Sequence, residues 1–319
     1  MTVADESRSQ GQSRPRRGPD IVLAGAARCG TTYLAARLAE NVRIDPGAVK
    51  EPNYYSRYLD RGHAWYEALY SQSSAELIRL DASVSYTYPQ HGEALGRVTA
   101  DSPQALGVYI VREPLERAVS HYLYYRHYFK MEPAESFAAA IRARSWYLDV
   151  SDYLRWFRAF DEAFAPGRRI VVPFQLVRAH PDDVTAFICR AVGIDAEQRL
   201  RSQGAGHRND VVEYRSDLAR RAVGAVRRSR VYPAVRRALG ADRVRSIRGG
   251  LTRRPTMPTT AEALASCDTG QRARLDEFAS RVRSCVADRL AAQDAEHGTD
   301  WSPYWEAAVD DGPPPRAAH

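Results

Sequence analysis

The sequence predicts an α/β fold, in which a doubly wound parallel sheet is flanked by helices and followed by a basic helical C-terminal part. Short apolar runs alternate with amphipathic stretches over residues 20–194, and this alternation is typical of parallel strands joined by helices. The first unit of the series is a strand, a glycine-containing loop and a helix. Arginine-rich sequence follows the alternating part, and helical periodicity returns over residues 261–292.

The expected strands are short apolar runs, and the expected helices show apolar residues at helical spacing. The strongly apolar run ALGVYIV predicts a strand that ends at Arg112, and Pro114 suits the first turn of the helix that follows. The expected strands are residues 20–25, 76–83, 105–111 and 168–174. The expected helices are residues 31–40, 61–71, 91–101, 113–129, 151–164, 181–194 and 261–292.

The composition indicates a soluble protein with one large domain, or one domain with an appendage. With 319 residues, 44% of them apolar, the chain is long enough to bury a substantial core. It contains no run of about 18 apolar residues, so no membrane span is expected. Residues 1–19 lack the apolar segment of a secretory signal and are interpreted as a disordered leader. We expect a domain over 20–310, with a core at 20–194 and a basic helical part at 195–310, and a frayed tail at 311–319.

Cysteine, lysine and arginine usage indicates the setting of the protein. The four cysteines form no C-x-x-C pair and no zinc-type cluster, which favours a reduced, cytoplasmic compartment. Only two of the 46 basic residues are lysines, and this bias indicates a GC-rich bacterial genome. Between residues 215 and 254, thirteen arginines accompany two acidic residues. This region is interpreted as a solvated helical surface or as a docking face for an acidic acceptor or a membrane surface. Nucleic-acid binding is disfavoured because no nucleic-acid motif occurs.

The stretch GAARCGTTYL, which begins at Gly25, looks like a phosphate-binding loop with one part missing. A triphosphate loop reads G-x-x-x-x-G-K-[ST], and here Gly25 and Gly30 have the right spacing while Thr31 occupies the lysine position. The open N-terminus of the following helix presents N–H groups to an anion, and Arg28 adds a fixed charge. An ordinary strand–turn–helix with glycines for the turn is the alternative interpretation.

A second candidate anion site lies in YIVREPLERAVSHY, residues 109–122. Arg112 leaves the carboxyl end of an apolar strand, which is where open α/β sheets place ligand groups. Arg112 and Ser120 would reach one phosphate if the chain turns back. The alternative is that Arg112 pairs with a nearby carboxylate, Glu113 or Glu116.

These two segments, in this order, resemble motifs of the sulfotransferase family that uses 3′-phosphoadenosine 5′-phosphosulfate (PAPS). The first is similar to the family's 5′-phosphosulfate loop, G-x-x-[KR]-x-G-T-T-x-L, and the second to its 3′-phosphate motif, R-[DE]-P-x-x-R-x-x-S-x-Y. The segment VKEPNYYS (49–56) is similar to K-E-[PT]-x-F-F of the heparan-sulfate and bacterial carbohydrate branch. Weaker matches are LDASVSYTY, which lacks the family's lysine and proline, and SDYLRWFRAF…RRIVVPFQLV. The resemblance covers about residues 20–194, and GAGHRND (204–210) is the nearest candidate for the family's late cofactor loop.

The resemblance implies PAPS as donor, a hydroxyl acceptor and no metal. It makes Glu51 the general base, with Lys50 orienting it or touching the sulfuryl oxygens, and it gives Arg28 the task of neutralising the leaving phosphate. The donor-binding residues that it implies are Arg28, Cys29, Gly30, Thr31, Thr32, Tyr33, Arg112 and Ser120. From the residues alone, a solvated surface pair is the alternative for Lys50 and Glu51. The competing bases are His63, His91 and His121.

The acceptor class and two rival functions stay open at this level. The acceptor would be a hydroxyl of a carbohydrate, a glycosylated metabolite or another small-molecule or lipid metabolite. One rival is a P-loop kinase-like phosphotransferase that has lost its loop lysine, although no acidic cluster resembles a magnesium site. The other rival is a non-enzymatic module that binds anions.

Overall fold

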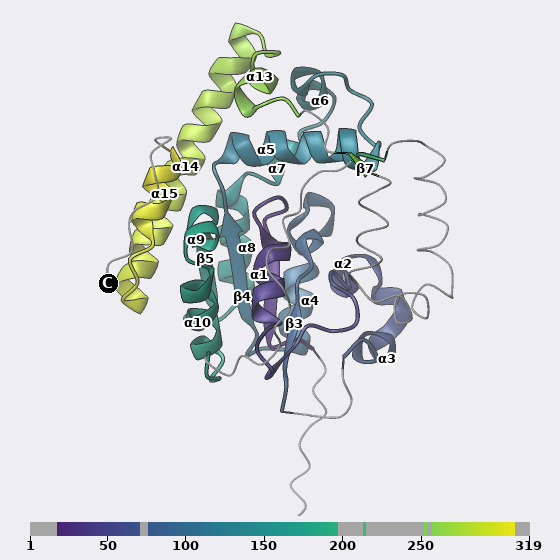
Figure 1. The fold of residues 1–319 in the computed structure, drawn as a ribbon, viewed down its shortest axis with the longest axis vertical. Helices are drawn as coiled ribbons and strands as arrows, with labels where there is room; N and C mark the ends of the chain where they lie inside the picture. Colours follow the sequence, from purple (N-terminus) through teal and green to yellow (C-terminus); the bar gives the residue numbers. More distant parts are fainter. Residues whose placement is uncertain (1–17, 71–75, 197–212, 215–251, 254–256, 310–319) are drawn as a thin grey trace, which may run out of the picture.

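The computed structural model has the predicted α/β architecture, a parallel sheet flanked by helices (Figure 1). It describes residues 18–70, 76–196, 213–214, 252–253 and 257–309. Four sequence predictions fall wholly or largely outside these residues. They concern the leader 1–19, the loop 204–210, the arginine-rich region 215–254 and the tail 311–319.

The central sheet has five parallel strands in the order β2-β3-β1-β4-β5. Four of them confirm the predicted strands, with ends within three residues of the expected ones. The edge strand β2 was not predicted, because two residues make no apolar run. The strands are β1 (Ile21–Gly25), β2 (Ile44–Asp45), β3 (Ile78–Asp81), β4 (Leu106–Val111) and β5 (Arg169–Pro173).

The six helices predicted before residue 195 are present, although several are shorter than expected, and the helices at residues 54–57, 137–143, 146–149 and 174–179 were not predicted. The predicted helix 113–129 is an α-helix, α5, that continues into a π-helical segment, η4 (Tyr124–Phe129). The other short elements are the 3₁₀ turns η1 (Leu59–Arg61), η2 (Val84–Thr87) and η3 (Pro89–His91). The helices of this part are α1 (Thr31–Leu38), α2 (Tyr54–Arg57), α3 (Gly62–Glu67), α4 (Ala94–Asp101), α5 (Pro114–Leu123), α6 (Phe137–Ala143), α7 (Trp146–Asp149), α8 (Tyr153–Ala163), α9 (Phe174–Ala179) and α10 (Pro181–Ala191).

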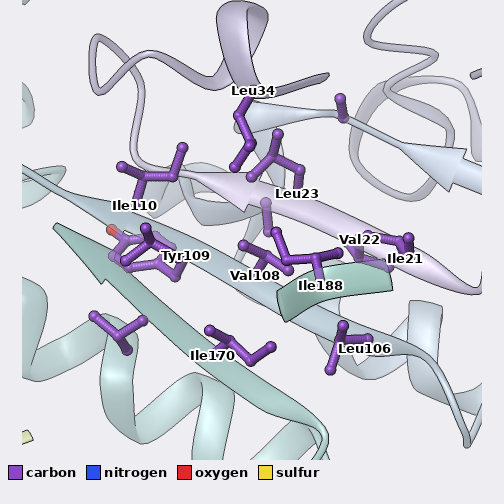
Figure 2. Close-up of a cluster of buried hydrophobic side chains, with 14 of the residues drawn as sticks. Ile21, Val22, Leu23, Leu34, Leu106, Val108, Tyr109, Ile110, Ile170 and Ile188 are labelled. Carbon is purple, nitrogen blue, oxygen red and sulfur yellow. The ribbon is translucent and has the colours of Figure 1, made fainter. Parts of the chain in front are cut away.

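The core forms where the sheet meets its helices. Every residue of β1 and β4 is buried, and strands buried on both faces read as continuous apolar runs. Side chains from β1, β4 and β5 belong to one cluster with Leu34 of α1 and Ile188 of α10 (Figure 2). This burial explains why the apolar runs were a reliable signal.

The strand order creates a switch point between β1 and β4. From β1 the chain crosses to β2 and β3 on one side, and from β4 it crosses to β5 on the other. Such a reversal opens a crevice at the carboxyl ends of the two strands, which is the usual ligand position in this architecture. The two ends are joined directly, since the amide of Ala26 donates to the carbonyl of Ile110 at 2.9 Å.

The described C-terminal part consists of α13 (Thr260–Leu264), α14 (Thr269–His297) and α15 (Ser302–Val309). The helix α14 runs along one side of the molecule beside β5 and α8 (Figure 1). The prediction of a wholly helical part 195–310 did not include the antiparallel pair β6 (Glu213–Tyr214) and β7 (Thr252–Arg253). Among the described residues, no helix combines the length and the apolar character needed to cross a bilayer.

A side chain from α14 completes the edge of the sheet at β5. The side-chain oxygen of Gln293 accepts from the amide of Val171 at 2.7 Å, and its Nε2 donates to the carbonyl of Val171 at 2.9 Å. Both residues are buried. The amide side chain therefore satisfies two backbone groups that a sixth strand would otherwise pair.

We expect Gln293→Ala to destabilise the fold. The substitution leaves a buried N–H and a buried carbonyl of Val171 without partners, and each orphaned group costs about 1–3 kcal/mol, so the free energy of unfolding should fall by roughly 2–4 kcal/mol. Denaturant titration followed by circular dichroism measures the change. Glu296→Ala, an exposed substitution on the same helix, is the control and should shift stability by less than about 0.5 kcal/mol. Equal stability of the two variants would contradict the assigned role of Gln293.

Candidate active site

A cavity of about 700 Å³ lies at the carboxyl ends of β1 and β4. Its wall includes the loop between β1 and α1, the residue that follows β4, the end of α5 with η4, and the beginning of α9. Glu51 and the region of η2 also contribute to the wall. Segments that are distant in sequence thus meet at the crevice that the strand order creates.

The loop between β1 and α1 keeps the N-terminus of α1 open. Gly30 has φ 84°, and an added Cβ would lie 3.0 Å from the Phe174 ring, so the position requires glycine. No side chain caps α1, which leaves the N–H groups of its first turn for an anion. Thr31 and Thr32 both line the cavity at this point. The loop therefore presents the free N–H groups and hydroxyls that an anion site requires.

Arg28 carries a half-buried positive charge into the cavity wall. Its Nε donates to the Ser120 hydroxyl at 3.3 Å, and its guanidinium lies 4.0 Å from the centroid of the Tyr124 ring. Burial lowers the pKa of Arg28, and the charge of Arg112 lowers it as well. Two like charges at one wall create a strong preference for an anion between them.

Arg112 is held at its backbone and lines the cavity. The Tyr153 hydroxyl donates to the Arg112 carbonyl at 2.9 Å and accepts from the Arg112 amide at 3.2 Å, which fixes the end of β4. The ion pair with a nearby carboxylate, which the sequence left open as an alternative, is also formed, because Nε of Arg112 lies 3.0 Å from a carboxylate oxygen of Glu116. Glu113 is not its partner and pairs with Arg283 of α14 at 2.6 Å.

The two anion-binding segments are joined by Arg117, which is fully buried. Its Nη1 donates to the carbonyl of Ala27 in the first loop at 3.2 Å, and its Nε donates to the Ser151 hydroxyl at 2.5 Å. Its Nη2 donates to the carbonyl of Tyr147. The motif arginine of α5 therefore positions the first loop from behind and does not line the cavity.

Glu51 lines the cavity, whereas Lys50 is exposed and is not part of the wall. Nζ of Lys50 lies 2.5 Å from Oε1 of Glu51, so the solvated pair that the sequence left open is formed. Glu51 and Asn53 have φ values of 61° and 52°, a left-handed conformation that non-glycine residues adopt only when neighbours hold them. The carboxylate is thus both paired with a lysine and presented to the cavity.

Hydrogen bonds from neighbouring side chains hold the backbone of Glu51 and Asn53 in place. The side-chain Nδ2 of Asn53 donates to the carbonyl of Glu51 at 2.7 Å, and the backbone N–H of Asn53 donates to the Ser83 hydroxyl at 3.0 Å. Ser83 in turn donates to Asp81 at 2.6 Å. A chain of three hydrogen bonds therefore connects the segment of Glu51 to the end of β3.

Asp81 anchors that chain as a buried carboxylate. It also accepts from the hydroxyls of Tyr66 at 2.9 Å and Tyr86 at 2.7 Å. Burial raises the pKa of Asp81 to about 6, although its hydroxyl donors act in the opposite direction. Asp81, Ser83 and Tyr86 belong to the segment that lacks the family's lysine and proline, and here that segment supports the backbone of Glu51.

Of the three competing histidines, His121 lines the cavity. His63 lies 2.7 Å from a carboxylate oxygen of Asp101, and His91 ends the turn η3 away from the wall. Burial lowers the pKa of His121 well below its ordinary value, and the charges of Arg117 and Arg28 lower it further. His121 is therefore a neutral imidazole at physiological pH.

The predicted donor-binding residues do not all reach the cavity. Tyr33 lines it, but Cys29 is fully buried with its sulfur 4.0 Å from the Tyr153 hydroxyl, and its amide donates to the carbonyl of Ala26 at 3.1 Å. Burial raises the pKa of the Cys29 thiol to about 11, so the side chain is neither exposed nor ionised. Any role of Cys29 toward a ligand is limited to shaping the loop.

Sequence reasoning missed an aromatic wall and a third arginine. Phe174 follows β5 directly and Arg178 lies in the last turn of α9, and the carboxyl end of a parallel strand was the signal that could have identified this segment. The remaining unpredicted lining residues are Ala27, Val84, Tyr88, Tyr124, Tyr125, Phe129 and Val177. Among the described residues, no group of three or more His, Cys, Asp or Glu side chains is arranged to hold a metal ion.

The geometry defines an α/β protein with a cavity at the carboxyl ends of its parallel strands, where a strand–loop–helix unit has an uncapped helix N-terminus and two arginines. The family model described as the sulfotransferase family matches residues 49–198. Heparan sulfate glucosamine 3-O-sulfotransferase 6 of Mus musculus is 28% identical over 174 residues, which cover 49% of this chain and 48% of that protein. Heparan sulfate glucosamine 3-O-sulfotransferase 3B1 of Homo sapiens is 32% identical over 105 residues, which cover 33% of this chain and 26% of that protein. The chain thus spans about half the length, or less, of these relatives.

A solved structure supports the fold. The crystal structure of a sulfotransferase from Alicyclobacillus acidocaldarius superposes with a TM-score of 0.51 at 21% identity, covering 66% of this chain and 93% of that chain. The predicted P-loop-like fold and the predicted resemblance to the sulfotransferase family are therefore confirmed.

The buried carboxylate of Asp81 makes stability depend on pH. Its pKa is about 6 in the folded state against an ordinary 3.8, so the native state binds this proton more tightly than the unfolded state. The contribution to stability is therefore complete below about pH 4 and is lost as the pH rises through about 6. We expect a loss of about 3 kcal/mol across this window.

Asp81→Asn should flatten the profile, because the amide does not titrate. Denaturant titrations between about pH 4 and pH 7.5 measure it. Glu93→Gln removes an exposed carboxylate and should leave the profile of the natural protein intact. If Asp81→Asn retained the full slope, another group would have to be its source.

Proposed function

We propose that the protein is an enzyme that transfers the sulfuryl group of PAPS to an acceptor hydroxyl. The observation that supports this most is the meeting, on one cavity, of the open N-terminus of α1, Arg112 with Ser120, and Glu51. Two anion-binding elements suit a donor that carries negative charge at two ends. A carboxylate on the same wall suits removal of a hydroxyl proton.

The residues present fit PAPS as donor. The N–H groups of Gly30, Thr31 and Thr32 would hold the 5′ end, while Arg112 and Ser120 would hold the 3′-phosphate. A loop without the lysine of triphosphate sites is compatible with a donor that has no γ-phosphate. PAPS supplies the sulfuryl group and the phosphate that leaves.

The proposed reaction is an in-line transfer. The acceptor oxygen forms a bond to sulfur while the bond from sulfur to the 5′-phosphate oxygen breaks, and the hydroxyl proton passes to Glu51. Arg28 would neutralise the charge that develops on the leaving phosphate, an electrostatic effect favoured by its half-buried position. Lys50, paired with Glu51 at 2.5 Å, would orient the base from the outside.

For the acceptor we propose a ring-bearing molecule, of which a sugar is the favoured class. Tyr88, Tyr124 and Tyr125 line the same cavity as Glu51. Aromatic faces pack well against sugar rings, and phenol hydroxyls pair with sugar hydroxyls. The named relatives act on glucosamine of heparan sulfate. A role of residues 215–254 toward an acidic acceptor or a membrane surface, and a cytoplasmic location, remain predictions from the sequence.

Nucleotide binding separates this function from that of a kinase without its lysine. Titration calorimetry with adenosine 3′,5′-bisphosphate in the absence of magnesium should give clear binding. Magnesium-dependent binding of ATP, with no binding of the bisphosphate, would favour the kinase. Transfer of labelled sulfuryl from PAPS to a metabolite extract, followed by isolation of the labelled product, would then identify the acceptor.

We expect Glu51→Gln to abolish most sulfuryl transfer while leaving donor binding intact. A glutamine keeps the shape of the side chain but accepts no proton, and loss of a general base lowers the rate by roughly 100-fold to 10,000-fold. The measurements are labelled sulfuryl transfer and the bisphosphate dissociation constant. Glu162→Gln, an exposed substitution on α8, is the control. Retained transfer in Glu51→Gln would remove Glu51 from the mechanism.

Arg112→Ala should act on donor binding first. Loss of hydrogen bonds from a guanidinium to a phosphate costs about 1.5–3 kcal/mol, so the bisphosphate dissociation constant should rise roughly 10-fold to 100-fold. Arg158→Ala removes an exposed arginine of α8 and should leave the constant within about twofold. Unchanged affinity in Arg112→Ala would argue against its contact with the 3′-phosphate.

A further inference from the structure

His121 is a buried side chain with one ring nitrogen unused. It is 1% exposed, and its Nδ1 lies 3.1 Å from Nη1 of Arg117. A guanidinium only donates, so Nδ1 must accept and the ring proton must reside on Nε2. Nε2 is buried and has no hydrogen-bond partner among the described residues. The ring is thus a fixed neutral imidazole with an unpaired N–H.

One neighbour of His121 is the wall formed by Arg28. Ser120, the preceding residue, accepts from Nε of Arg28 at 3.3 Å. Arg117, the partner of Nδ1, also holds the carbonyl of Ala27 at 3.2 Å. The imidazole is therefore fixed relative to the loop that would hold the leaving phosphate.

Two of the aromatic rings beside His121 line the cavity together with Glu51. The centroid of the His121 ring is 5.1 Å from that of Tyr125 and 6.1 Å from that of Tyr88. Burial raises the pKa of both phenols, and the negative charge of Glu51 raises it further. All four residues line the same cavity. His121 thus shares one cavity with both Arg28 and Glu51.

A buried N–H without a partner is unfavourable, and an oxygen of a ligand in the cavity would satisfy it. Anionic oxygens are the strongest acceptors for such a donor. In the proposed reaction the sulfuryl group passes from the loop that contains Arg28 to a hydroxyl that contacts Glu51. Its oxygens would therefore lie in the cavity that His121 also lines.

We propose that Nε2–H of His121 donates a hydrogen bond to a sulfuryl oxygen of PAPS. The inference rests on the proposed function and gives His121 a binding role in place of the general-base role, because Nε2 already carries its proton. Adenosine 3′,5′-bisphosphate has no sulfuryl group and cannot make this contact. The two nucleotides therefore isolate the contribution of His121.

Two substitutions separate the donor at Nε2 from the acceptor at Nδ1. His121→Asn places a carbonyl oxygen where Nδ1 accepts from Arg117 but has no atom at the Nε2 position. His121→Gln brings an amide N–H to the Nε2 position. Titration calorimetry should show that His121→Asn binds PAPS roughly 10-fold more weakly, a change of about 1.4 kcal/mol. Its affinity for the bisphosphate should stay within about twofold, and His121→Gln should recover most of the PAPS affinity.

Equal loss of affinity for both nucleotides, or no loss for either, would overturn the proposal. A natural protein that binds neither nucleotide would contradict the proposed function itself, and the proposal with it. If the variants do not fold, nitrogen NMR of histidine-labelled natural protein gives the answer. The proposal requires the Nε2–H tautomer and a shift of that proton on binding PAPS but not on binding the bisphosphate. The Nδ1–H tautomer, or the same shift with both, would overturn it.

Discussion

The cavity depends on one buried positive charge, the guanidinium of Arg117. It is 0% exposed, and no carboxylate pairs with it among the described residues. Neutral acceptors surround it instead, namely the carbonyls of Ala27 and Tyr147 and the hydroxyl of Ser151. Burying a charge is tolerable only when such partners are in place, so the loop after β1 and the segment around α7 must be correctly placed together. The position of His121 follows from the same guanidinium.

The fold was largely predictable because its central strands are buried on both faces and therefore appear as apolar runs. The short edge strand Ile44–Asp45 leaves no such signal, and the π-helical geometry of η4 has no periodicity that distinguishes it from an α-helix. The meeting of Arg28 and Arg112 followed from their places after strand ends, where parallel topology brings loops together, and Ser120 lies on the helix that follows Arg112.

Other parts of the site depend on packing that no local pattern reveals. Asp81 and Glu51 are thirty residues apart in sequence, and only the fold places the hydroxyl of Ser83 between the buried carboxylate and Asn53. The sequence showed this segment merely as a departure from the family's motif. Cys29 was expected to contact the ligand because it belongs to the loop that was expected to bind it. Adjacent residues of a tight loop point in opposite directions, however, and the sulfur of Cys29 lies in the core.

The pairing of Gln293 with Val171 has a consequence for association between molecules. An uncovered edge strand offers its N–H and carbonyl groups to any other chain, and proteins avoid aggregation by blocking such edges. Here the block is a side chain that arrives about 120 residues later, so a partially synthesised or proteolysed chain without α14 would have an open edge at β5. The last long helix therefore acts as protection against intermolecular β-pairing as well as a brace for the domain.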